Sequence, residues 1–178
     1  PPALVFPLFE EDLDSYLYNN ETPEIKLKEI VWMITSGLKG LHDRNIIWRD
    51  LKPSNILITE TPRLKLALTD FGLSLCPTDT MGKHVCSYSY RPPEVFFKIG
   101  GGGAHIDVWG LGVTFYKMVF GELMVFDQDG DVVEALKQIA GALEVIWSDL
   151  VLPGCEKRTE LCKEANRLLK EGEKDETL

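Results

Sequence analysis

The clearest periodicity in the chain is helical and ends near His42. Apolar residues recur there at helical spacing: Ile30, Ile34, Leu38 and Leu41. This spacing places one apolar stripe along one side of a helix. Thr22 followed by Pro23 is typical of a helix start, with the threonine as N-cap and the proline in the first turn. The pattern predicts an amphipathic helix that buries a single face.

Four further segments have helical patterns. Acidic residues 10–12 suit the positive end of a helix dipole, and they predict a short helix that ends near Asn19. The segment 107–120 is apolar on most of its faces, which predicts a buried helix. A third helix is predicted over residues 131–143. The segment 161–178 is charged with leucines on one side and predicts a terminal helix or tail.

Short β-compatible runs flank a polar stretch. Residues 45–48 and 56–58 lie on either side of the polar residues 49–55, and residues 64–68 alternate as another strand. The apolar run 3–6, stopped by a proline, predicts the buried end of a strand. Charged residues held between two buried runs indicate a functional site. The elements together predict a mainly α fold with short β-hairpins.

The charge of the chain argues against nucleic acid and anionic membranes as partners. Its 178 residues include 19 basic and 28 acidic ones, for a formal net charge of -9, and they contain no block of lysine and arginine. Surfaces that neutralise phosphate groups need the opposite balance. With 44% apolar residues, the chain is long enough for one ordinary domain with its own core.

The four cysteines show no metal-binding spacing and no dense disulfide framework: Cys76, Cys86, Cys155 and Cys162. This usage fits a reducing, intracellular compartment, either cytoplasmic or nuclear. We interpret Cys76 and Cys86 as inert thiols rather than redox-sensitive ones. The longest apolar stretch, residues 108–116, is about half of the ~20 residues that a membrane-spanning helix needs. No transmembrane segment is therefore predicted.

Several polar motifs occur in a fixed order. They are Arg49-Asp50-Leu51-Lys52 with Asn55, then Asp70-Phe71-Gly72, then Pro93-Glu94, and then Asp107-Val108-Trp109-Gly110. In this order they resemble the eukaryotic protein kinase family over about residues 3–145. The stretch Tyr90-Arg91-Pro92-Pro93-Glu94 resembles the serine/threonine branch that includes cyclin-dependent and mitogen-activated kinases, called CMGC. The resemblance implies the large lobe of a protein kinase.

The resemblance also implies a role for each residue of the polar stretch. Asp50 would accept the proton of the substrate hydroxyl, and Lys52 would steady the transferring phosphate. Asn55 and Asp70 would supply oxygen ligands to Mg²⁺. The implied reaction transfers the γ-phosphoryl group of ATP to a serine or threonine hydroxyl of a protein substrate. The resemblance is also compatible with a regulatory protein partner.

The start of the chain resembles the hinge that joins the two lobes of a kinase. Phe6 would stand at the back of the nucleotide pocket. Pro7 would offer adenine its C=O, and Phe9 would offer its N–H, so a proline at position 7 loses no required donor. Asp12 would lie near the ribose, and Leu57 would form the apolar floor under adenine. These roles all follow from the resemblance.

The segment from Asp70-Phe71-Gly72 to Pro93-Glu94 resembles a kinase activation segment. Ser87 would bridge the catalytic aspartate and lysine, and Arg91 belongs to the Tyr90–Glu94 stretch after it. Arg49 marks kinases whose activation segment is ordered by an added phosphate. Thr78 and Thr80 are the candidate acceptors of that phosphate.

Other residues receive structural interpretations. Asp107 is either a helix cap or, by the resemblance, a buried acid that holds the backbone of the catalytic loop. His42 is assigned no chemistry. The tryptophans at or near helical stripes are interpreted as core residues: Trp32, Trp109 and Trp147.

Two features depart from the kinase pattern. Trp48 stands where the family has a histidine, and we interpret it as an aromatic that fills the same apolar space. No glycine-rich loop and no V-A-I-K lysine precede Leu4, so we expect the small lobe to be absent and the chain alone to be inactive.

We divide the chain into a hinge strand and linker (1–9), a large lobe (10–160) and the terminal segment (161–178). A pseudokinase or truncated kinase that serves as a protein-interaction module is the alternative.

Overall fold

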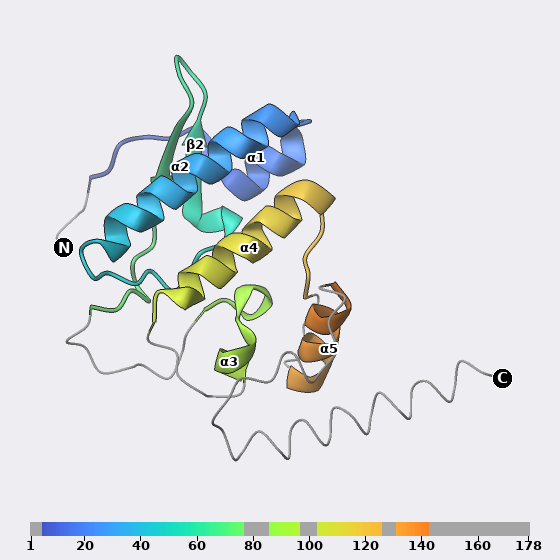
Figure 1. Cartoon of the computed structure of the whole chain (residues 1–178). Helices are drawn as coiled ribbons and strands as arrows, with labels where there is room; N and C mark the ends of the chain where they lie inside the picture. The colour runs from blue at the N-terminus through green and yellow to red at the C-terminus, as the bar shows by residue number, and fades with distance from the viewer. Residues whose placement is uncertain (1–4, 77–85, 97–102, 126–130, 143–178) are drawn as a thin grey trace.

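The computed structural model describes residues 5–76, 86–96, 103–125 and 131–142 (Figure 1). These residues form five α-helices and one small antiparallel sheet. The helices are α1 Leu13–Asn19, α2 Glu24–His42, α3 Pro93–Phe96, α4 His105–Phe120 and α5 Val132–Ala142. Two 3-10 helices add single turns at Pro53–Asn55 and Tyr88–Tyr90. The expected mainly α composition is confirmed for this part of the chain.

The sheet has three strands in the order β1 (Glu11–Asp12), β2 (Ile56–Thr59) and β3 (Lys65–Leu68). β2 and β3 form an antiparallel hairpin in which Ile56 pairs with Leu68. Both strands lie where short β-compatible runs were predicted. β1 pairs with β2 so that Asp12 lies opposite Leu57. The sheet therefore brings together residues 11–12, the strand that follows the polar stretch and the strand that leads to Asp70.

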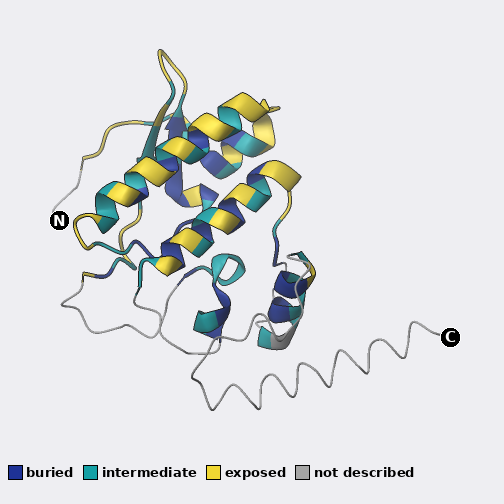
Figure 2. Ribbon diagram, viewed as in Figure 1, coloured by how far each residue is buried: buried dark blue, intermediate teal, exposed yellow. Residues whose placement is uncertain are grey.

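The main core lies between α2, α4 and the sheet. Helices α2 and α4 lie side by side, and their inward faces are buried (Figures 1 and 2). The buried residues of this core include Leu13, Ile30, Ile34, Leu38, Trp48, Ile56, Ile58 and Met118. The apolar stripe predicted for α2 is thus confirmed. Each fully buried side chain of this kind stabilises the fold by about 1.5–3 kcal/mol relative to its exposed state.

The start of α2 differs from the prediction in its cap. The helix begins at Glu24, with Pro23 in the N-cap position in an extended conformation (φ -60°, ψ 149°). The carbonyl of Pro23 accepts from the N–H of Lys26 at 2.9 Å. Thr22 does not cap the helix, because its hydroxyl donates instead to the carbonyl of Asn20 at 3.4 Å.

The first apolar run was wrongly predicted as a buried strand. Val5 and Phe6 are 94% and 74% exposed, and the described residues around them form no strand. No described element pairs with Val5 and Phe6, so these two side chains remain in contact with solvent. The described residues therefore build no pocket behind Phe6, where the resemblance had placed it.

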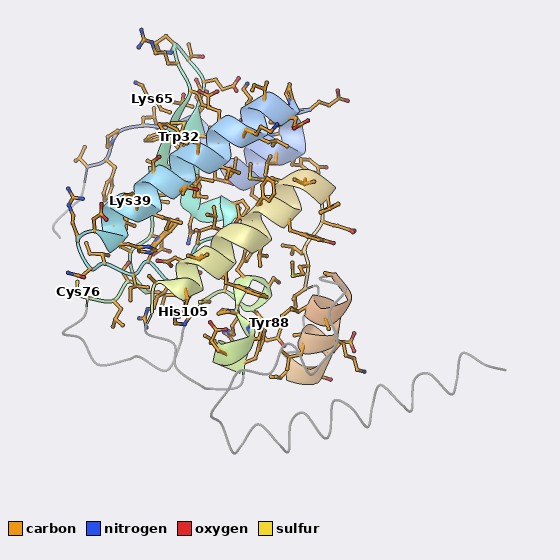
Figure 3. All side chains as sticks on the ribbon, in the orientation of Figure 1. Trp32, Lys39, Lys65, Cys76, Tyr88 and His105 are labelled. Carbon is orange, nitrogen blue, oxygen red and sulfur yellow. The ribbon has the colours of Figure 1, made fainter. Side chains whose placement is uncertain are left out.

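Two further burial predictions are wrong. Trp32 (labelled in Figure 3) is 69% exposed, because it lies two residues from Ile30 and therefore points to the opposite side of α2. Helix α4 is not buried on all faces, since Val108, Phe115 and Val119 are exposed. These three residues lie at helical spacing on the side of α4 that no described element covers.

Some expectations lie outside the described residues. They concern the terminal segment 161–178, Trp147 and the candidate phosphate acceptors Thr78 and Thr80. Among the described helices, none has both the length and the apolar character to cross a membrane.

Candidate active site

Asp107 anchors the loop that carries the site. Its wholly buried carboxylate accepts from the backbone N–H of Arg49 at 2.7 Å and from that of Trp48 at 2.9 Å. The Nε2 atom of His42 lies 2.8 Å from the same carboxylate. Arg49 has a left-handed backbone (φ 67°), so the loop turns sharply at this point. Of the two interpretations of Asp107, the buried acid that holds the loop is confirmed.

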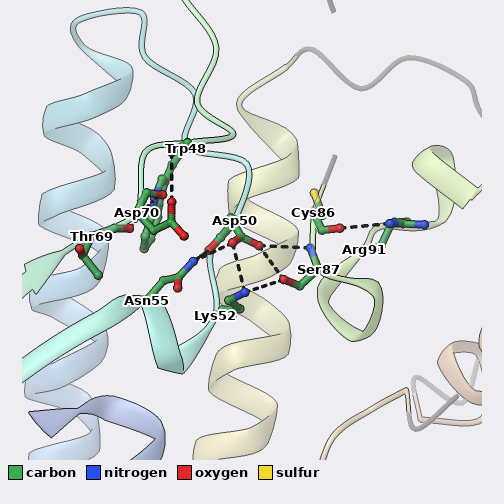
Figure 4. Close-up of polar contacts among 10 residues, drawn as sticks. Trp48, Asp50, Lys52, Asn55, Thr69, Asp70, Cys86, Ser87 and Arg91 are labelled. Carbon is green, nitrogen blue, oxygen red and sulfur yellow. Dashed lines mark hydrogen bonds and ion pairs between the residues drawn. The ribbon is translucent and has the colours of Figure 1, made fainter. Parts of the chain in front are cut away.

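Asp50 lies at the centre of a hydrogen-bond network on this loop (Figure 4). The amide of Asn55 donates to Asp50 Oδ2 at 2.7 Å and to its backbone carbonyl at 3.0 Å. Ser87 donates to Asp50 Oδ1 through its hydroxyl at 2.7 Å and through its backbone N–H at 3.2 Å. Lys52 Nζ lies 3.2 Å from Asp50 Oδ2 and donates to Ser87 Oγ at 2.8 Å. A buried carboxylate, a cation and a hydroxyl therefore meet at one point.

Two opposing effects set the pKa of Asp50. Burial of the carboxyl group raises the pKa, but the hydrogen bonds from Ser87 and Lys52, the charge of Lys52 and the hydrogen bond from Asn55 outweigh it. The pKa of Asp50 is consequently lower than its ordinary value. The group is ionised at neutral pH, as a proton acceptor must be.

The β2–β3 register brings Asn55 next to the segment that carries Asp70. Asn55 precedes β2, and its backbone carbonyl accepts from the N–H of Thr69, the residue before Asp70, at 3.0 Å. Both hydrogen bonds from the Asn55 amide go to Asp50, so its Oδ1 atom is available to a cation. Asp70 is exposed, and its Oδ1 accepts from the N–H of Gly72 at 3.1 Å.

These two oxygen donors fit a magnesium ion held partly by phosphate. Magnesium is usually bound by one or two protein oxygens together with water and substrate phosphates. Among the described residues, no group of three or more His, Cys, Asp and Glu side chains forms a complete metal cage. If such an ion is bound, Asn55 and Asp70 are the described residues that would hold it.

Trp48 has a polar contact that its apolar interpretation missed. Its ring is wholly buried, as expected, but the indole N–H donates to the carbonyls of Thr69 and Asp70. Sequence alone gives no signal for this contact, because the acceptors are backbone atoms more than 20 residues further along the chain.

The predicted nucleotide residues are only partly brought together. The β1–β2 register places Asp12 beside Leu57, which is half-buried. The carboxylate of Asp12 accepts from both the N–H and the hydroxyl of Ser15 at 3.0 Å, so it also caps α1. Phe9 is half-buried and Pro7 is exposed. Their contacts with a nucleotide stay predictions.

Two arginines border the activation segment. The Nε of Arg49 donates to the carbonyl of Leu73 at 2.6 Å, while its buried Nη1 has no hydrogen-bond partner among the described residues. Arg91 donates to the carbonyl of Cys86 at 3.1 Å. Its guanidinium carbon lies 5.4 Å from the centre of the Tyr88 ring. Arg91 thus fixes the segment that carries Ser87.

A separate cavity lies between α1, the α1–α2 connection and the end of α4. Its volume is about 560 Å³, and an ion pair between Lys117 and Asp14 lies in its wall. The cavity contains none of the residues predicted to act in catalysis. The ion pair joins residues 103 positions apart in sequence, so the sequence pattern gave no indication of it.

Comparisons with known proteins give the family. Residues 3–172 match the family model described as "Protein kinase domain". "Cyclin-dependent kinase 17" of Caenorhabditis elegans is 36% identical over 127 residues, which are 68% of this chain and 19% of that protein. "Cyclin-dependent kinase 14" of Oryctolagus cuniculus is 35% identical over 143 residues, which are 77% of this chain and 30% of that protein.

The chain thus spans roughly a fifth to a third of the length of these curated relatives. The order of its motifs, the family match and these identities agree with one another. The chain belongs to the protein kinase family, in the serine/threonine CMGC branch that includes the cyclin-dependent kinases.

Proposed function

We propose that this protein is a serine/threonine protein kinase that transfers the γ-phosphoryl group of ATP to a protein hydroxyl. The observation that carries the proposal is the network of Asp50, Lys52 and Ser87 around one ionised carboxylate. The chain would supply the hinge and the large lobe, and an ATP-covering small lobe would be needed for full activity. An intracellular location, cytoplasmic or nuclear, belongs to this proposal.

In this proposal each polar residue has a separate task. Asp50 orients the substrate hydroxyl and accepts its proton, which requires the ionised state that the lowered pKa provides. Lys52 lies beside Asp50 and stabilises the negative charge of the transferring group. Asn55 Oδ1 and the Asp70 carboxylate hold Mg²⁺. The metal ion, when bound, offsets charge on the phosphate oxygens.

The nucleotide would lie across the sheet. Leu57 offers an apolar surface to adenine beside β1, and Asp12 lies at the adjoining position of the register. Pro7 and Phe9 would present a backbone carbonyl and N–H to the adenine edge. This assignment rests on the family resemblance and on the pairing of β1 with β2.

Phosphate on the activation segment would complete the site. The buried Nη1 of Arg49 lacks a partner in the described part of the chain, and an unpaired buried guanidinium nitrogen favours an anionic ligand. Thr78 and Thr80 are the proposed acceptors of that phosphate. Arg91 supports the same segment through Cys86.

A second candidate function is that of an interaction module. The exposed apolar side chains of α4, namely Val108, Phe115 and Val119, favour contact with another protein. In this alternative the chain is a pseudokinase or truncated kinase that binds partners without catalysis. The names of the relatives also support a cyclin-type regulatory partner for the intact protein.

Nucleotide titration with the full-length protein separates the two functions. A kinase binds ATP in a Mg²⁺-dependent manner and transfers labelled γ-phosphate to serine or threonine of a protein substrate. Asp70→Asn should weaken the Mg²⁺-dependent binding, whereas Asp43→Asn on the exposed end of α2 should not. Absence of both binding and transfer would favour the interaction module.

A further inference from the structure

Glu60, the residue that follows β2, joins segments that lie far apart in the sequence. Its carboxylate accepts from the hydroxyl of Tyr16 on α1 at 2.6 Å and from the ammonium group of Lys26 on α2. Its backbone N–H donates to the carboxylate of Glu10, the residue before β1, at 3.1 Å. The end of β2, both helices and the start of β1 therefore meet at one residue (Figure 1).

The side chains around Glu60 are held in the protonation states that form these bonds. Hydrogen bonds from Lys26 and Tyr16 lower the pKa of Glu60, so its carboxylate is ionised at neutral pH. Burial, and then the hydrogen bond to Glu60, raise the pKa of Tyr16, so the phenol keeps its proton. The Tyr16 side chain is itself part of the main core. The end of β2 is thus fixed to the core through Tyr16.

Glu10 carries this fixed position to the linker. Hydrogen bonds from the backbone N–H of Glu60 and the hydroxyl of Thr59 hold its carboxylate and lower its pKa. The next two residues pair with β2 as the short strand β1, with Asp12 opposite Leu57. Glu10 therefore fastens the chain to the sheet one residue after Phe9.

We propose that Glu60 is a positioning residue that sets the place of the Phe9 backbone relative to Leu57. Leu57 lies in β2, three residues before Glu60, and Phe9 precedes the Glu10 carboxylate that Glu60 holds. One residue therefore aligns the two sides of the proposed adenine site, and the inference rests on that proposed function. Without the network, the linker would be ordered only when the nucleotide binds, and this ordering lowers affinity.

The test uses variants of the full-length protein. Tyr16→Phe removes one hydroxyl from the network and keeps the buried ring. Tyr18→Phe is the matched control, because it removes the hydroxyl of a tyrosine on the same helix that is 92% exposed. Glu10→Ala removes the contact with the linker, and a double variant combines it with Tyr16→Phe. The measurements are the amide hydrogen exchange of residues 9–12, the Kd for ADP by calorimetry, and kcat at saturating ATP.

Tyr16→Phe should raise both the exchange rate of residues 9–12 and the Kd for ADP by about three- to tenfold, the factor expected for one net hydrogen bond. The kcat at saturating ATP should stay within about twofold, because the change affects binding rather than the transfer step. Glu10→Ala should act similarly, and the double variant should lose no more than either single variant. Tyr18→Phe should show none of these effects.

Three results would overturn the positioning role. They are unchanged exchange at residues 9–12 in Tyr16→Phe, exchange that rises equally throughout α2, and losses of ADP affinity that simply add in the double variant. In that last case, Tyr16 would act on the nucleotide independently of Glu10.

The exchange measurement needs no nucleotide. If the wild-type protein binds no ADP but Tyr16→Phe still loosens residues 9–12 and leaves α2 unchanged, the proposed function fails while the positioning of the linker stands. If the wild-type protein binds ADP and every variant binds it equally well, the positioning role fails and the proposed function stands.

Discussion

The anchoring of the catalytic loop by Asp107 leads to a quantitative prediction. Asp107→Asn keeps the shape of the side chain but replaces one acceptor oxygen with an NH₂ group. The wild-type carboxylate accepts from two backbone N–H groups and contacts His42 Nε2 at 2.8 Å, in a fully buried position. In the variant, the new NH₂ group therefore faces the backbone N–H of Trp48 or of Arg49 in a buried position, where both groups are donors.

The expected loss of stability follows from these contacts. A hydrogen bond to a charged group contributes about 1.5–3 kcal/mol, and an unsatisfied buried N–H costs about 1–3 kcal/mol. We expect Asp107→Asn to lower the free energy of unfolding by about 3 kcal/mol. With a urea m-value of about 2 kcal/mol/M, the unfolding midpoint should fall by about 1.5 M.

The assay is equilibrium urea unfolding followed by tryptophan fluorescence. The matched control is Asp43→Asn, which removes an exposed ion pair with Lys39 one turn away. Such pairs contribute at most about 0.5 kcal/mol, so the control midpoint should hardly move. A loss below about 1 kcal/mol for Asp107→Asn, or equal losses for both variants, would refute the anchoring role.

Two further predictions concern titration and thiol reactivity. The hydrogen-bond partners of Asp50 lower its pKa. Protonation of Asp50 should therefore reduce the transfer rate only at a pH below the ordinary pKa range of an aspartate, which sets the acid limb of the pH–rate profile. Ser87→Ala removes a hydrogen bond to the ionised form and should move that limb to higher pH; superimposed pH–rate profiles would contradict this reasoning. Burial raises the pKa of Cys86 to about 12, so its thiol stays protonated at pH 8. Iodoacetamide followed by peptide mass spectrometry should therefore label exposed Cys76 before Cys86, and the reverse order would contradict the structure.

Local periodicity predicted the elements well where one face is buried. The stripe of α2 and the β2–β3 hairpin follow from side-chain spacing, because burial on one face selects that spacing. Trp32 shows the limit of residue type as a guide to burial. A large aromatic side chain suggested the core, but its angular position on α2 points it to solvent.

The chemistry of the site was predictable as a set of residues but not as a set of contacts. The order of the motifs identified Asp50, Lys52 and Asn55 as one group. The donation from Trp48 to backbone carbonyls depends on the path of a distant segment, and carbonyls carry no sequence signal. The ion pair between Lys117 and Asp14 was missed for the same reason, since the two residues meet only when α1 and α4 are in place.

The most direct test of the proposed kinase site is the rate of phosphate transfer by full-length protein carrying Asp50→Asn. The substitution keeps the size of the side chain and removes its ability to accept a proton. We predict that kcat falls by about 10²–10⁴-fold, while the KM for ATP stays within about threefold of the wild-type value. Equal rates for the variant and the wild-type protein would contradict the assignment of Asp50 as the catalytic base.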